Sequence, residues 1–211
     1  MWFKTPTRAP DWADAVRHLR RDPALRPIIR RVGPCTLHPR RDYFVVLCKS
    51  IFTQQISTKI ATVLFARFAA LFPNQRPTPA RVVAALTGGV DDATLRMCGL
   101  SRQKRAYLLD LARHFVDGRI PTHRLARMSD EEVIDALVTV NGIGRWTAEM
   151  FLIFTLNRPD VLPVDDLGLR KGIQTVYRLP AMPKPLECVA LAEPWRPWRT
   201  IATWYLWRGT A

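Results

Sequence analysis

The sequence predicts an all-α protein built from about ten short helices. Apolar residues recur at helical spacing in many segments, and Trp12, Ala15, Val16 and Leu19 form one such stripe. Helix-start signals are frequent, whereas the alternating patterns typical of strands are weak throughout. Proline and glycine residues separate the segments, so each helix is expected to be short.

In the first half of the chain, the long segment 42–72 is helical in pattern. We expect it to be split near 54–57, because Ser57 is a suitable N-cap for a second helix. Asp91 or Asp92 can cap another short helix in the same way. The helices expected in this half cover 11–21, 23–32, 42–54, 58–72, 79–87, 91–97 and 102–116.

In the second half, Ser129 and Glu132 have the spacing of a capping box, which opens a helix to about Thr139. Either Asp165 or Asp166 can cap a later helix that ends near residue 177. The remaining helices expected in this half cover 145–156, 186–192 and 197–207.

The composition indicates a soluble domain with a polyanionic partner. Of the 211 residues, 48% are hydrophobic and 24% are charged, and the net charge is +14. Such a charge favours nucleic acid as the partner. An anionic membrane is the alternative, but it would require a basic helix with a bare apolar face, and the arginines here are scattered. The simplest alternative is an arginine-rich chain that is merely basic.

The location expected from the sequence is a compartment that contains DNA. The N-terminus has no apolar signal-peptide segment, and no apolar run reaches the length of about 18 residues that a membrane span needs. We therefore expect a protein of the cytoplasm, associated with the nucleoid if bacterial, or of the nucleus if eukaryotic.

The four cysteines do not have the spacing of a metal site. Cys35, Cys48, Cys98 and Cys188 are 13, 50 and 90 residues apart, which matches neither a zinc site nor an iron–sulfur cluster. We expect reduced thiols and no iron–sulfur cluster.

The sharpest local signal is the segment Leu137–Ala148, in which two helices flank a turn with glycines two residues apart. Gly142 can adopt a positive φ and turn the chain, and Gly144 lets another backbone approach. The following helix begins with N–H groups that favour an anion such as a DNA phosphate, and Arg145 adds a positive charge. An ordinary αα-hairpin is the alternative.

Two carboxylates follow this hairpin. Asp165 and Asp166 come about 20 residues after Gly144, behind a short loop that contains Pro163. A carboxylate held at such a place can stabilise positive charge that develops during a reaction, and it can orient or deprotonate water. The alternative is a helix N-cap, worth about 1 kcal/mol.

These features together resemble the helix-hairpin-helix DNA glycosylase superfamily, and the pattern is most similar to DNA-3-methyladenine glycosylase II. The resemblance extends from about Tyr43 to Trp207 and includes the run of tryptophans near the C-terminus. It implies a monofunctional enzyme of base excision repair that hydrolyses the N-glycosidic bond of alkylated bases. It also implies a monomeric protein that binds double-stranded DNA containing such bases.

The resemblance also implies how the chain is organised. One compact glycosylase domain spans 1–211, and DNA would cross a cleft between two helical subdomains. A six-helix subdomain over 43–159 carries the hairpin at 137–148, and the second subdomain combines 1–42 with 160–211.

Site residues are carried over from the resemblance by position. Asp166 is the expected catalytic carboxylate, with Asp165 as a cap or as the alternative catalyst. The segment 51–58 resembles the part that displaces the target base, and Gln55 matches the residue that fills the gap. The base pocket would contain Trp146, Met150 and Trp207. The residues expected to contact DNA are Gln54, Gln55, Ser57, Gly142, Ile143, Gly144, Arg145 and Thr147.

No cofactor is expected to be required. In the resembling motif, main-chain carbonyls also hold a monovalent cation, Na⁺ or K⁺, and by position these belong to Val138, Val140 and Ile143. Three alternatives remain at this point. The chain could be a helix-hairpin-helix DNA-binding module without catalysis, a glycosylase for another damaged base, or a bifunctional enzyme with a lysine nucleophile. Trp146 occupies the position of that lysine.

Overall fold

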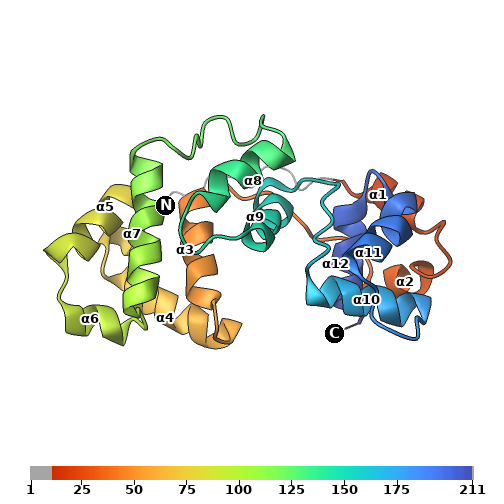
Figure 1. The fold of residues 1–211 in the computed structure, drawn as a ribbon, viewed down its shortest axis with the longest axis horizontal. Coiled ribbons are helices and arrows are strands. Elements are labelled where there is room, and N and C mark those ends of the chain that lie inside the picture. The colour runs from red at the N-terminus through yellow and green to blue at the C-terminus, as the bar shows by residue number, and fades with distance from the viewer. Residues whose placement is uncertain (1–10, 211) are drawn as a thin grey trace. The chain divides into compact units, whose positions relative to one another are not determined.

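The computed structural model describes residues 11–210, and it confirms the all-α class for this part of the chain. These residues form helices joined by loops and turns and contain no strand (Figure 1). Expectations about residues 1–10 and 211, including the place of the first ten residues in a helical subdomain, lie outside the described residues.

The chain divides into two compact units. Unit 1 consists of the described parts of Met1–Arg40 and Leu152–Ala211, and unit 2 is Arg41–Phe151. The α-helices of unit 1 are α1 (Ala13–Leu19), α2 (Arg26–Val32), α10 (Leu167–Tyr177), α11 (Pro185–Ala192) and α12 (Arg199–Gly209). Those of unit 2 are α3 (Tyr43–Thr53), α4 (Thr58–Ala70), α5 (Pro79–Ala84), α6 (Asp92–Met97), α7 (Arg102–Val116), α8 (Asp130–Val138) and α9 (Arg145–Phe151).

The subdomain limits expected from the sequence differ from these units in three respects, the first of which is that residues 41–42 group with unit 2. Unit 2 contains seven α-helices, whereas the resemblance implied six. Residues 152–159 group with unit 1. The Arg40 N–H donates to the Thr155 carbonyl at 2.9 Å, and the Phe154 ring stacks on Trp207 with 5.5 Å between ring centroids.

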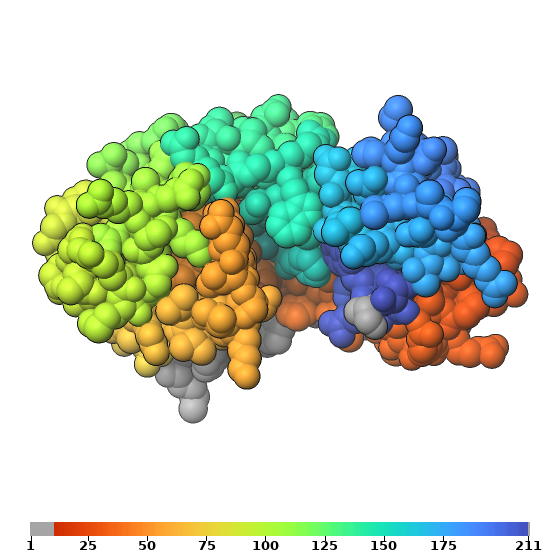
Figure 2. Space-filling model, turned by 60° about the horizontal axis from the view of Figure 1, so that its bottom comes forward, coloured from red at the N-terminus to blue at the C-terminus, as the bar shows by residue number. Residues whose placement is uncertain are grey.

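Unit 2 is built around α3 and α7, which run side by side (Figure 1). Helix α5 packs on α7, and α4 and α9 pack on α3. The core between α3 and α4 is aromatic, because the ring centroid of Phe52 lies 5.4 Å from those of Phe65 and Phe68. In Figure 2 the orange atoms of the α3–α4 segment reach the surface of this unit.

Unit 1 is organised around α12. All seven residues from Thr200 to Leu206 are buried, so the helix is enclosed on every side instead of presenting one apolar stripe. Helices α1, α2 and α10 pack against it. Trp195 is also fully buried and belongs to the core of this unit.

The predicted helix starts are confirmed where a capping residue signals them. The hydroxyl oxygen of Ser57 accepts from Ile60 N at 3.4 Å, and Asp91 rather than Asp92 caps α6, accepting from Thr94 N at 2.9 Å. Ser129 opens α8 through the predicted capping box.

Helix ends are less well predicted. Helix α9 stops at Phe151 and continues as a wider π-type turn over Leu152–Leu156, so it is shorter than the expected 145–156. A similar turn over Ala85–Gly89 follows α5 and includes the two glycines that we expected to lie outside the helix. Helix α2 begins at Arg26, three residues later than expected, because Asp22 accepts from Ala24 N at 2.8 Å and forms a turn.

The cysteines are free thiols distributed over both units. Cys48, Cys98 and Cys188 are buried and Cys35 is half-buried. Burial raises the pKa of the Cys35 thiol to about 11. Among residues 11–210, no helix has the length and apolar character needed to cross a membrane.

Candidate nucleic-acid interface and active site

The hairpin between α8 and α9 has the backbone that its glycines predict. Gly142 adopts φ +85°, and a Cβ placed there would lie 2.3 Å from the ring of Tyr107. At Gly144, by contrast, no protein atom lies within 4 Å of such a Cβ. Gly142 is therefore required by the fold of the hairpin, whereas the space beside Gly144 is open to a ligand.

The hairpin is anchored to α7 by a carboxylate that the sequence did not reveal. Asp110 accepts from both the backbone N–H and the side-chain amide of Asn141, each at 2.8 Å. The apolar residues of the motif point inward, since Leu137, Val140, Ile143 and Ala148 are all buried. The turn is thus held by Asp110 and by the buried apolar residues of the motif without any ligand.

Helix α9 begins directly after the hairpin, where Ala148 N donates to the Gly144 carbonyl at 3.1 Å. The first N–H groups of an α-helix have no acceptor within the helix, and they attract anions. Thr147, in this first turn, is half-buried.

The charge of Arg145 is largely offset within unit 2. Its guanidinium pairs with Glu131 at 2.6 Å and with Glu149 at 3.3 Å. The pair with Arg145 holds the pKa of Glu131 below its usual value. The sequence predicted the position of Arg145 but not these two partners, so the backbone N–H groups remain the main attraction for an anion at this turn.

The loop between α3 and α4 contacts the hairpin directly. The Gln54 side-chain amide donates to the Gly142 carbonyl at 2.7 Å, across 88 residues of chain. Gln55 is exposed and has φ +64°, a left-handed conformation that is uncommon for a residue other than glycine. Gln54 therefore positions the loop on the hairpin, and Gln55 extends from it. Ser57 caps α4, which gives it a structural role besides any contact with DNA.

Asp166 is the N-cap of α10 and has two clear donors. Its Oδ1 accepts from Leu169 N at 2.6 Å and from the indole Nε1 of Trp207 at 2.8 Å. Asp165 is exposed and does not cap the helix, which corrects the expectation that it could do so. A carboxylate held by a helix N-terminus and an indole N–H is fixed in orientation, as general base or electrostatic catalysis requires.

Trp207 is held in turn by its neighbours. Its ring stacks on Phe154 at an interplanar angle of 20°. A Cβ at Gly168 would lie 3.0 Å from the indole ring and 3.1 Å from Asp166 Oδ1, so the absence of a side chain there gives both groups room. Phe154 and Gly168 were not identified from the sequence, because neither belongs to a recognisable motif.

Trp146 and Met150, the other two expected pocket residues, lie four residues apart on α9 and share one face of that helix. Trp146 is 48% exposed and Met150 is half-buried. An aromatic face of this size, open to solvent, is suited to stacking against a flat ligand.

The three carbonyls expected to hold a cation lie around the hairpin turn. Val138 is the last residue of α8, where helical carbonyls lack partners within the helix. The Val140 carbonyl accepts from Ile143 N at 3.0 Å and retains a second lone pair. Among the described residues, no group of three or more His, Cys, Asp or Glu side chains could hold a metal ion.

An anchored glycine hairpin followed by a fixed carboxylate is the combination expected of a helix-hairpin-helix glycosylase. Comparison with known families agrees, since residues 48–197 match the HhH-GPD superfamily of base excision DNA repair proteins. The chain belongs to this family. The resemblance inferred from the sequence is thereby confirmed.

Individual relatives extend this result. The chain is 39% identical over 171 residues to DNA-3-methyladenine glycosylase 1 of Schizosaccharomyces pombe, covering 80% of this chain and 73% of that protein. It is 30% identical over 193 residues to DNA-3-methyladenine glycosylase 2 of Escherichia coli, covering 87% and 61% of the two chains.

The structural comparison gives the same relationship. The structure of the S. pombe 3-methyladenine DNA glycosylase in complex with abasic DNA superposes with a TM-score of 0.81 and 35% identity, covering 93% of this chain and 96% of that one. A DNA-3-methyladenine glycosidase from Bacillus halodurans superposes with a TM-score of 0.80 and 31% identity, covering 97% and 90%.

Proposed function

We propose that this protein is a monofunctional DNA glycosylase that hydrolyses the N-glycosidic bond of alkylated bases, of the 3-methyladenine type, in base excision repair. The observation that carries the proposal is Asp166, whose carboxylate is fixed by Leu169 N and Trp207 Nε1 in a chain that also has the glycine hairpin. The names of the relatives point to the same activity.

Asp166 supplies the chemistry. As the bond to the base breaks, positive charge develops on the sugar, and a fixed carboxylate stabilises that charge. The same carboxylate orients a water molecule and accepts its proton, so that hydroxide adds to the sugar carbon and the base departs with the bonding electron pair. Trp207 acts as a positioning residue, because its N–H holds the carboxylate oxygen.

Alkylated bases suit the aromatic groups of the chain. Methylation at a ring nitrogen makes a purine cationic, and the face of an aromatic ring attracts a cation. Trp146 presents an exposed ring on α9, and Trp207 lies beside the proposed catalytic carboxylate. We assign Trp146, Met150 and Trp207 to base recognition.

DNA binding rests on backbone groups rather than on sequence-specific contacts. The first turn of α9 and the open space at Gly144 suit a phosphate, and Ile143, Arg145 and Thr147 border it. Gln55, on its left-handed turn, is the side chain that we expect to enter the duplex when the target base leaves. We further propose that the protein acts as a monomer, in the compartment that contains the DNA.

A monovalent cation, Na⁺ or K⁺, fits the turn. Carbonyl oxygens are the ligands that hard cations prefer, and Val138, Val140 and Ile143 offer such oxygens around the hairpin. When bound, the ion would add positive charge beside the phosphate site.

The product is expected to be an intact strand with an abasic site. A lysine nucleophile would form an imine and then cleave the strand, but Trp146 stands in the position of that lysine. The nearest lysine before the hairpin, Lys104, donates its Nζ to the Phe52 carbonyl at 2.9 Å. We expect that borohydride traps no complex of protein and DNA. We also expect that a gel of end-labelled DNA shows no strand-cleavage products before alkali treatment.

The proposal is tested by incubating methylated duplex DNA with the protein and identifying the released bases by mass spectrometry. Release of 3-methyladenine, with 7-methylguanine as a second candidate, is the expected result. Binding to the duplex without release of any base would show instead a DNA-binding module. Release of an oxidised or deaminated base alone would assign another damage class.

A further inference from the structure

A strongly basic surface lies in unit 1, on α1, α2 and the segment that joins them. A hollow of about 530 Å³ is lined only by arginines, and we call it the arginine hollow. Its five residues are Arg17, Arg20, Arg21, Arg26 and Arg30. All five side chains are exposed. Because like charges this close repel one another, the free protein bears a cost that an anionic ligand would relieve.

The arginine hollow is preorganised and only partly neutralised. The Nε of Arg26 donates to the Arg20 carbonyl at 3.0 Å, which fixes one guanidinium across the turn. Arg17 pairs with Asp14 at 3.1 Å, while no carboxylate within residues 11–210 pairs with Arg20, Arg21 or Arg30.

The one acidic residue in the turn is occupied by other donors. Asp22 Oδ1 accepts from Ala24 N at 2.8 Å and from Leu25 N at 3.3 Å. Its Oδ2 accepts from Trp195 Nε1 at 3.1 Å and from the hydroxyl of Tyr177. The charge of Asp22 is therefore directed into unit 1 and away from the five guanidinium groups.

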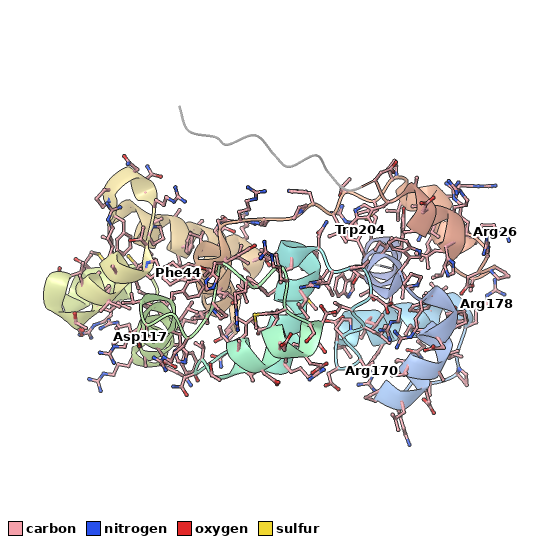
Figure 3. All side chains as sticks on the ribbon, turned by 90° about the horizontal axis from the view of Figure 1, so that it is seen from above. Arg26, Phe44, Asp117, Arg170, Arg178 and Trp204 are labelled. Atoms are coloured by element: carbon pink, nitrogen blue, oxygen red, sulfur yellow. The ribbon has the colours of Figure 1, made fainter. Side chains whose placement is uncertain are left out.

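The arginine hollow is separate from the proposed active site. Asp166 caps the start of α10, and Tyr177 is its last residue. The helix has 11 residues, which at about 1.5 Å per residue makes it about 16 Å long. Because Tyr177 bonds Asp22 in the α1–α2 turn, the hollow lies at the end of α10 opposite Asp166. Figure 3 shows Arg26 and Arg178, the C-cap of α10, at the same end of this unit.

The chemistry of the arginine hollow suits phosphodiesters. Guanidinium groups bind phosphate oxygens through paired N–H bonds. An anionic membrane surface would also require exposed apolar residues on the same helices, but Leu19, Ile28 and Ile29 are buried. We propose that the arginine hollow binds backbone phosphates of duplex DNA away from the damaged base, and so adds affinity for undamaged DNA. This inference rests on DNA being the partner of the chain.

The test compares two triple variants with the unsubstituted protein. The hollow variant is Arg20→Gln/Arg21→Gln/Arg30→Gln. The matched control, Arg81→Gln/Arg113→Gln/Arg127→Gln, removes the same charge from exposed positions of unit 2. Affinity for an undamaged duplex of several helical turns is measured against salt concentration. The hollow variant should lower the slope of log affinity against log salt by about two to three, because each phosphate that an arginine neutralises adds about 0.9 to that slope.

The controls separate this inference from the proposed glycosylase activity. At saturating DNA, the hollow variant should excise methylated bases at the rate of the unsubstituted protein, because Asp166 and Trp207 are untouched. Equal slopes for the hollow variant and the unsubstituted protein would overturn the inference. A control variant whose slope decreases as much as that of the hollow variant would overturn it as well. Binding of phosphatidylserine vesicles that depends on the hollow, with an unchanged DNA slope, would assign it to a membrane. If neither the unsubstituted protein nor the two variants excise methylated bases, only the proposed glycosylase function is refuted.

Discussion

Trp207→Phe removes one hydrogen bond from the proposed catalytic carboxylate and retains an aromatic ring against Phe154. The bond that it removes joins Trp207 Nε1 to Asp166 Oδ1 at 2.8 Å. A hydrogen bond to a charged group is worth about 1.5–3 kcal/mol. If this bond holds the carboxylate in its reactive orientation, base release should slow by about 10- to 150-fold, at about 1.36 kcal/mol per factor of ten.

The assay is single-turnover release of 3-methyladenine at saturating protein. DNA affinity should stay within about twofold, because phosphate contacts dominate it. The matched control is Trp204→Phe, three residues earlier on α12, where the side chain is 4% exposed and forms a cation–π contact with Arg208. This control should lower the melting temperature without slowing base release below that temperature. An unchanged rate in Trp207→Phe would refute the positioning role.

Three further substitutions test the hairpin and the ion pair beside it. Gly144→Val should leave the melting temperature unchanged, because no protein atom lies within 4 Å of the new Cβ, yet weaken binding to any duplex in a titration. Gly142→Val should lower the melting temperature as well, because its φ is +85° and its Cβ would lie 2.3 Å from the Tyr107 ring; equal melting temperatures for the two variants would contradict this assignment. Glu131→Gln should raise DNA affinity severalfold at low salt, since it removes a negative charge and releases Arg145 from the 2.6 Å pair. The exposed pair contributes only about 0–1 kcal/mol to stability, so a large fall in melting temperature together with unchanged affinity would argue against this reasoning.

Local signals predicted the helical framework well. Ser57, Asp91 and Ser129 cap the helices that they were expected to start, because an N-cap is an interaction between residues three positions apart. The positive φ of Gly142 was also predictable, because glycine adopts such a φ without steric cost. Helix ends were less predictable, since the wider turn after Phe151 depends on packing and not on a local signal.

The site was predicted in part. Asp166 was proposed as the catalyst from its place after the hairpin. Its bond to Trp207 spans 41 residues, and the backbone of the loop decides that Asp166 and not Asp165 caps α10. The bond from Gln54 to the Gly142 carbonyl spans 88 residues. Contacts of this range follow from the fold, and a single sequence carries no local pattern for them.

The catalytic group is identified by comparing two single substitutions at neighbouring aspartates. Asp166→Asn keeps the shape and can still cap α10, since Asn and Asp are equivalent as N-caps, but it removes the negative charge. Single-turnover release of 3-methyladenine should fall by at least about 100-fold, with DNA affinity nearly unchanged. Asp165→Asn, an exposed neighbour with the same change in charge, should retain the rate. Loss of activity in Asp165→Asn with full activity in Asp166→Asn would reassign the catalyst, and full activity in both would contradict the mechanism.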